Sequence, residues 1–132
     1  MIVLAIIGIL AAIAFPMYRV QVYKAKLTEV TNSMSSVASA VATHYNEYRG
    51  WPADNADAAA IGSNLGIYVP NNRADWSTGG TPTTIQATIK NISVDNPTLD
   101  GCTLQLVANT TADSAVSWSW SGNIPAFYMP MK

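Results

Sequence analysis

The residues in this sequence that could do chemistry are few and scattered. The chain has one histidine, His44, and one cysteine, Cys102, and together they supply too few ligands for a metal site without carboxylates or a second subunit. A single cysteine also forbids an intrachain disulfide. We find no Ser/His/Asp arrangement, metal-ligand spacing or phosphate-binding glycine loop. The sequence therefore predicts a protein that is not an enzyme, has no cofactor or bound metal, and takes no small-molecule substrate.

Two weaker patterns could indicate modification or calcium binding. The stretches Asn91–Ser93 and Asn109–Thr111 match the N-glycosylation sequon, which a chain rich in Ser, Thr and Asn also matches by chance. Asp95, Asp100 and Asp113 could ligate calcium in loops, but their spacing lacks the regularity of a calcium-binding loop. We expect these three aspartates to be turn residues.

Composition divides the chain into three regions. Charged residues make up only 11% of the 132 residues, about half the usual share, and the net charge of -1 gives no electrostatic reason to expect nucleic-acid binding. Residues 1–18 carry no charge, residues 19–48 mix apolar and polar side chains, and the chain after Gly50 is rich in turn-forming residues. This length suits one domain, with or without an extension.

The first two regions predict one long helix that ends near Tyr48. From Met17 onward the apolar residues recur in steps of three and four, which is helical periodicity. Pro16 should kink the helix, and Gly50-Trp51-Pro52 should end it, with glycine at the cap. At 1.5 Å per residue the helix would be about 70 Å long, so its first half must be buried in lipid or against other copies of the chain. The residues expected in the domain core are Val20, Tyr23, Leu27, Val30, Met34, Val37, Val41 and Tyr45.

The third region predicts a small β-sheet. Alternating patterns indicate strands at Thr84–Ile92, Thr103–Ala108 and Ala115–Ser121, joined by turns as an antiparallel meander. Before them, Asp54–Ile61 should form a short helical segment capped by Asp54 or Asn55. The apolar tail Ile124–Lys132 should dock on the domain. The expected fold class is α+β, with the sheet packed against the helix.

The opening residues resemble a known family. IVLAIIGILAAIAFPMY, with Gly8 and then Pro16 eight residues later, resembles the N-terminal signature of bacterial type IV pilins. GWPADNA after the helix and the closing strands resemble the type IVa group more loosely. The resemblance implies the type IV pilin fold, with a protruding hydrophobic helix half at 1–24 and a globular domain at 25–132. Within that domain it implies an amphipathic helix half (25–48), an αβ-loop (49–83), and a sheet with its tail (84–132).

The chain departs from the family pattern in three places. The family's mature chain begins with a methylated aromatic residue and has a glutamate four residues later, so we expect Met1 to fall about six residues into that helix. Type IVa pilins usually close the C-terminal loop with two cysteines, but Trp120 stands where a cysteine would follow Trp118. Aromatic packing is therefore expected to hold the tail. Cys102 is expected to be a small apolar strand residue.

The resemblance implies a structural subunit that polymerises through its N-terminal helix into an extracellular type IV pilus. The pilus would serve adhesion, twitching motility or DNA uptake, and the partners would be identical subunits, the inner membrane before assembly, the pilus assembly machinery and a prepilin peptidase. Two alternatives are a pseudopilin of a type II secretion system and a monomeric membrane-anchored binding module. Arg19, Lys24 and Lys26 would by themselves favour a cytoplasmic domain, so the orientation rests on the resemblance.

Assembly assigns roles to the first residues. Small side chains let helices approach one another, and large ones supply apolar area. Gly8 and Pro16 bracket a stretch with weak helix support, which in related filaments loses its helix on assembly. Aromatic residues along the helix could suggest electron transfer, but their helical spacing favours a core face. The expected filament-core residues are Ile2, Leu4, Ala5, Ile6, Ile7, Gly8, Ile9, Leu10, Ala11, Ala12, Ile13, Ala14 and Phe15.

Overall fold

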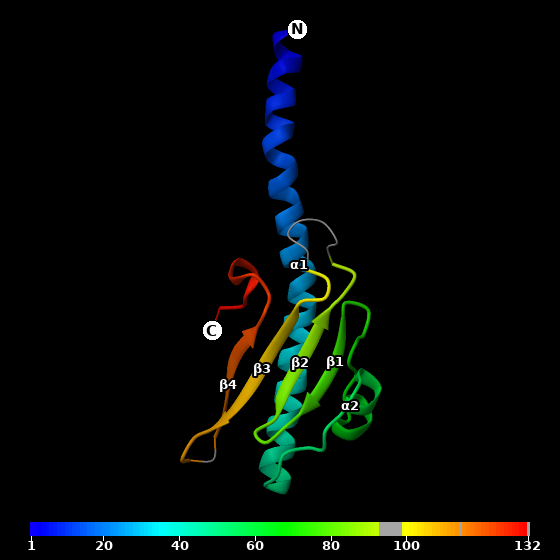
Figure 1. Cartoon of the computed structure of the whole chain (residues 1–132), viewed down its shortest axis with the longest axis vertical. Coiled ribbons are helices and arrows are strands. Elements are labelled where there is room, and N and C mark those ends of the chain that lie inside the picture. The colour runs from blue at the N-terminus through cyan, green and yellow to red at the C-terminus, as the bar shows by residue number, and fades with distance from the viewer. Residues whose placement is uncertain (93–98, 114, 132) are drawn as a thin grey trace.

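The protein is a long helix with a small sheet packed on its second half, and the first half of the helix stands clear of the domain (Figure 1). The computed structural model describes residues 1–92, 99–113 and 115–131. This arrangement confirms the predicted α+β pilin-like fold. The elements are α1 (Ile2–Tyr48), α2 (Ala58–Leu65), β1 (Ala74–Gly79), β2 (Thr84–Ile89), β3 (Thr103–Thr110), β4 (Val116–Gly122) and the 3-10 turn η1 (Ala126–Tyr128).

Helix α1 is continuous through Pro16 and ends at Tyr48. Pro16 removes the backbone donor that would bond to the Ala12 carbonyl, and the helix nevertheless continues through it. The prediction that Gly50 caps the helix was wrong. Arg49 takes the left-handed conformation (φ 54°, ψ 27°), and its N–H donates to the Tyr45 carbonyl at 2.8 Å. The left-handed residue therefore comes one position earlier than the glycine.

The described strands form one antiparallel sheet in the order β1-β2-β3-β4, which is the predicted meander with an additional strand. Strand β1 lies in the segment 49–83 that was expected to be a loop, and it pairs with β2 from Ala74↔Ile89 to Gly79↔Thr84. Strand β2 ends at Ile89 instead of Ile92. The reason is local: Asn91 has φ 56°, and the Asp100 carboxylate accepts the N–H groups of Asn91 and Ile92.

Helix α2 begins later than predicted, because Asp57 is its cap. The Asp57 Oδ1 accepts the Ala60 N–H at 2.8 Å. The two residues expected at the cap have other partners. The Asp54 carboxylate accepts the Gly80 N–H, and Asn55 forms a β-bridge with Thr78. The segment before α2 is thus tied to the edge of the sheet at β1.

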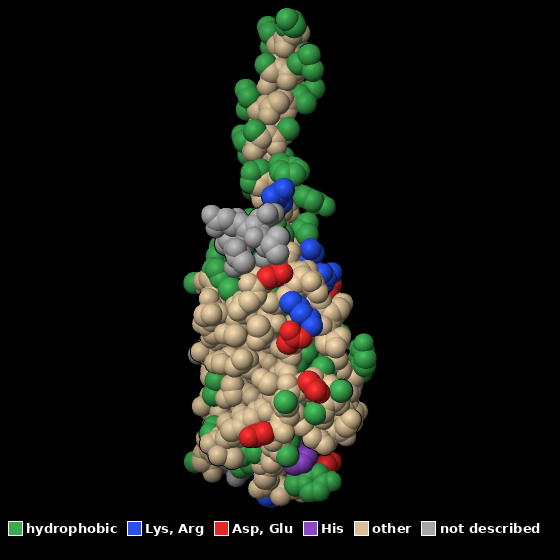
Figure 2. Space-filling model, turned by 45° about the vertical axis from the view of Figure 1, so that its right-hand side comes forward, with side chains coloured by type: hydrophobic (Ala, Val, Ile, Leu, Met, Phe, Trp, Pro, Cys, Tyr) green, Lys and Arg blue, Asp and Glu red, His purple; other side chains and the backbone are tan. Residues whose placement is uncertain are grey.

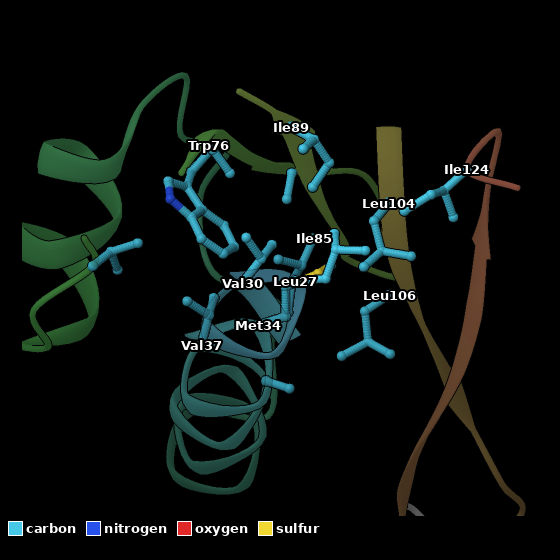
Figure 3. Close-up of a cluster of buried hydrophobic side chains, with 14 of the residues drawn as sticks. Leu27, Val30, Met34, Val37, Trp76, Ile85, Ile89, Leu104, Leu106 and Ile124 are labelled. Atoms are coloured by element: carbon cyan, nitrogen blue, oxygen red, sulfur yellow. The ribbon is translucent and has the colours of Figure 1, made fainter. Parts of the chain in front are cut away.

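The hydrophobic core lies between the second half of α1 and the inner face of the sheet (Figure 3). The helix contributes Leu27, Val30, Met34, Val37 and Val41, which are all buried, while Val20, Tyr23 and Tyr45 are half-buried at its margins. The facing residues come from all parts of the domain that follows, including the tail. They include Ile61, Trp76, Ile85, Ile89, Leu104, Leu106, Ile124 and Tyr128.

We predict that Met34→Ala destabilises the domain strongly. The Met34 side chain is fully buried, so its truncation leaves a cavity and should lower the free energy of unfolding by about 2–5 kcal/mol. Urea unfolding of the full chain in detergent, followed by tryptophan fluorescence, measures this. Asn32→Ala, at an exposed position on the same helix, is the control and should stay within about 0.5 kcal/mol of the parent. Equal unfolding midpoints for the two variants would contradict this account of the core.

Candidate assembly surface

The bare half of α1 is an apolar rod with no partner in the described part of the chain. The large side chains of this stretch are exposed, from 51% for Ile6 to 77% for Ile2. The helix is long and apolar enough to cross a membrane, and none of its most hydrophobic stretch is buried in the protein. A helix that is apolar on every face needs lipid or protein around it. All thirteen residues expected in the filament core, from Ile2 to Phe15, lie on this exposed part.

Small side chains give this rod places where another helix can approach closely. Ala5, Ala11, Ala12 and Ala14 are exposed, and a Cβ added at Gly8 would meet no atom within 4 Å. The described residues therefore give no packing reason for a glycine at position 8. Small residues on apolar helices favour close contact between helices.

The neck, defined here as residues 15–26 of α1, carries basic and aromatic side chains in contact. The Arg19 guanidinium lies over the Phe15 ring at 4.8 Å, and the Lys24 ammonium lies over the Phe127 ring at 3.8 Å. Lys26 Nζ donates to the Ile92 carbonyl at 3.4 Å. The sequence predicted that the tail docks on the domain, but no pattern in it could identify Lys24 as the partner of Phe127.

The residues that could have served a chemical site, His44, Cys102 and Asp100, contact the backbone, a neighbouring ring or the core. His44 Nδ1 lies 3.2 Å from the Gly50 carbonyl oxygen, and the His44 ring contacts the Tyr48 ring in a tilted arrangement, with 4.7 Å between centroids and 37° between planes. Cys102 is half-buried against the core, and Asp100 caps the end of β2. No three His, Cys, Asp or Glu residues in the described part of the chain come together to hold a metal ion.

The sequon and calcium candidates fall in several places. Asn109 is exposed, and its amide donates to the Ser119 hydroxyl at 3.2 Å. Asp113 is exposed in a turn after β3. Ser93, which completes the first sequon, and Asp95 lie outside the described residues.

A sequence profile of the pilin family, described as a bacterial filament protein, matches residues 24–132. The chain belongs to the pilin family. It is 41% identical over 130 residues to the fimbrial protein EcpC of Eikenella corrodens. The aligned region covers 98% of this chain and 82% of that relative. It is 34% identical over 120 residues to the type IV major pilin protein PilE of Neisseria gonorrhoeae, and the aligned region covers 89% of this chain and 67% of that relative.

A fimbrial protein of Neisseria meningitidis serogroup A is 32% identical over 120 residues, which covers 89% of this chain and 66% of that relative. These similarities confirm the resemblance to type IV pilins. Pilins are structural proteins, so this pilin is a filament subunit and not an enzyme, as predicted.

We predict that a chain of residues 19–132 is soluble and monomeric without detergent and keeps its fold. The truncation removes the uncharged apolar rod and retains Lys24, which contacts the tail, and every helix residue that is buried in the core. Light scattering after size exclusion measures the mass, and circular dichroism reports the fold. The full chain is the control and should require detergent. Aggregation of the folded truncated chain would show that apolar surface on the domain itself drives association.

Proposed function

We propose that this pilin polymerises through the bare half of α1 into an extracellular type IV pilus, and that the same half anchors it in the inner membrane before assembly. The observation that carries the proposal is the complete exposure of an uncharged apolar helix on a domain that otherwise buries its core well. Each large side chain contributes about 1.5–3 kcal/mol when it becomes fully buried. That free energy is gained only outside the chain.

The dimensions of the bare helix suit a bilayer. Residues 2–18 span about 26 Å at the rise of an α-helix, close to the hydrocarbon thickness of about 30 Å. The first charged side chain is Arg19. Lipid can therefore bury the rod in the monomer, and neighbouring helices can bury it in the fibre.

The stretch between Gly8 and Pro16 is the proposed site of a conformational change on assembly. In the free subunit it is helical and exposed. Glycine weakens a helix interior by about 1 kcal/mol relative to alanine, and Pro16 removes the hydrogen bond to the carbonyl of Ala12. We propose that this stretch unwinds when neighbouring subunits pack around it. The fibre would serve adhesion, twitching motility or DNA uptake, and its assembly would need a prepilin peptidase and the pilus machinery.

Imaging of surface fibres tests the proposal directly. Fibres sheared from cells that express this chain, imaged by cryo-electron microscopy at helical resolution, should have the first half of α1 in the core and the sheet outside. Residues 8–16 should be unwound. A chain that stays with the inner membrane and enters no fibre would contradict the proposal. It would then favour a pseudopilin or a monomeric membrane-anchored module.

We predict that Gly8→Leu separates assembly from folding. A Cβ at position 8 meets no atom of the described residues within 4 Å, and leucine strengthens the helix, so the monomer should fold and enter the membrane normally. In the fibre the added bulk occupies space that a neighbouring helix needs. The yield of sheared fibres should fall, while the amount of membrane-bound subunit stays at the parent level.

The matched control for Gly8→Leu is Ser36→Leu, which adds a similar side chain at an exposed position on the domain half of the same helix. Ser36→Leu should leave fibre yield near that of the parent. An unchanged yield for Gly8→Leu would mean that position 8 faces no close neighbour in the fibre.

A further inference from the structure

We infer that the C-terminal tail is a second membrane contact: Phe127 and Met131 lie on the surface of an anionic bilayer while α1 spans it. This inference rests on the membrane-anchored state proposed above and goes beyond it. It assigns a lipid-facing surface to the globular domain itself. The domain would then sit on the membrane in one orientation before assembly.

The tail divides its apolar side chains between two directions. Ile124 and Tyr128 are buried in the core and hold the tail in place. Phe127 is 65% exposed and Met131 is 95% exposed. The 3-10 turn η1 follows Ile124 and ends at Tyr128, whose N–H donates to the Pro125 carbonyl at 2.9 Å. The turn thus presents Phe127 outward, and Met131 follows it beyond the buried Tyr128.

The contact between Lys24 and Phe127 places this turn at the neck. Lys24 follows Arg19 by five residues, so it lies about 7.5 Å further along the helix axis. The polar interface of a bilayer is about 5–8 Å thick on each side. When the uncharged residues of α1 fill the hydrocarbon region, Phe127 therefore lies at headgroup depth. Tyr and Trp are enriched at that depth, and Tyr18, which is 68% exposed, lies near the same boundary.

Basic side chains of the domain also lie toward the bare half of α1. Arg19, Lys24 and Lys26 lie on the neck, and Figure 2 shows most of the visible Lys and Arg side chains in the part of the domain nearest the bare helix. Glu29, the nearest acidic residue on α1, pairs with Arg73 at 3.3 Å. Glu47 lies in the last turn of α1, far from the neck, and Asp54 lies beyond the end of α1, where its carboxylate accepts the Gly80 N–H. The Asp100 carboxylate also lies near this end, where it accepts the N–H groups of Asn91 and Ile92. The neck itself carries three cations and no acidic residue, so the neck complements an anionic lipid surface.

A spin label beside Phe127 tests this inference in the full chain. The label is placed by Ala126→Cys in a Cys102→Ser background, which leaves Phe127 and Met131 intact. The protein is reconstituted into vesicles of phosphatidylglycerol and phosphatidylcholine. Power saturation compares the label's accessibility to oxygen, which concentrates in lipid, with its accessibility to a water-soluble nickel complex. Tyr68→Cys, at an 86% exposed position on the loop after α2, is the matched control.

The expected result is that oxygen reaches the label at position 126 more readily than nickel does, whereas the label at position 68 shows the reverse. Phe127→Ser with Met131→Ser should abolish the preference for oxygen. Lys24→Gln with Lys26→Gln, or vesicles of phosphatidylcholine alone, should reduce it. A third label, at Leu10→Cys, reports whether α1 spans the bilayer.

Two results would overturn the inference and can be told apart from a failure of the proposed anchoring. If Leu10 is deep in lipid but position 126 is in water, the anchoring stands and the tail contact is wrong. If position 126 is in water in vesicles but shielded in sheared fibres, the tail surface serves a neighbouring subunit instead. If position 10 is itself in water, the anchored state fails, and the inference fails with it.

Discussion

The structure depends on one helix that must satisfy two different environments. The second half of α1 buries Leu27, Val30, Met34, Val37 and Val41 under the sheet, and the first half buries nothing. Because the two halves are one continuous helix, the domain cannot fold over its own apolar rod. Stability of the domain is therefore local, and burial of the rod requires lipid or other subunits. Membrane anchoring and polymerisation are two solutions to the same physical problem.

The domain half of the helix keeps its outer face polar with few charges. Hydroxyl groups on that face donate to backbone carbonyls four residues earlier, as Thr28 does to Lys24 and Ser39 to Ser35. Such bonds satisfy the hydroxyl within the helix and leave a short side chain outside. A surface of this kind is wettable, yet it can approach another surface without large desolvation of charge. This property suits a subunit that must pack closely with its copies.

Periodic patterns in the sequence predicted the long helix and most of the strands. The features that they did not predict depend on hydrogen bonds and contacts formed in the folded chain. The steps of three and four along α1 and the alternation in β2, β3 and β4 were sufficient to predict one helix and a meander. Strand β1 escaped prediction because ADWSTG has few β-branched residues, and it is recognisable only through its pairing with β2. Several adjacent residues could have capped each helix, and the tertiary structure decides which one does. Arg49 caps α1 and Asp57 caps α2. The exposure of the rod follows from its length, but the contact between Lys24 and Phe127 joins residues too distant in sequence for any local pattern.

The tail is held to both β3 and α1 without a disulfide in the described part of the chain. Gly122 has φ 140°, and a Cβ there would lie 2.3 Å from the Thr103 carbonyl oxygen, so only glycine lets β4 end this close to β3. Asn123 then exchanges hydrogen bonds with Thr103 through its N–H and its side-chain oxygen.

From this point Ile124 and Tyr128 enter the core, and Phe127 reaches Lys24. The exposed face of the tail is thus fixed to the helix that we propose spans the bilayer. If subunits leave the membrane during assembly, withdrawal of that helix must carry the tail away from the headgroups as well, so the apolar area of both surfaces becomes available to neighbours in one step.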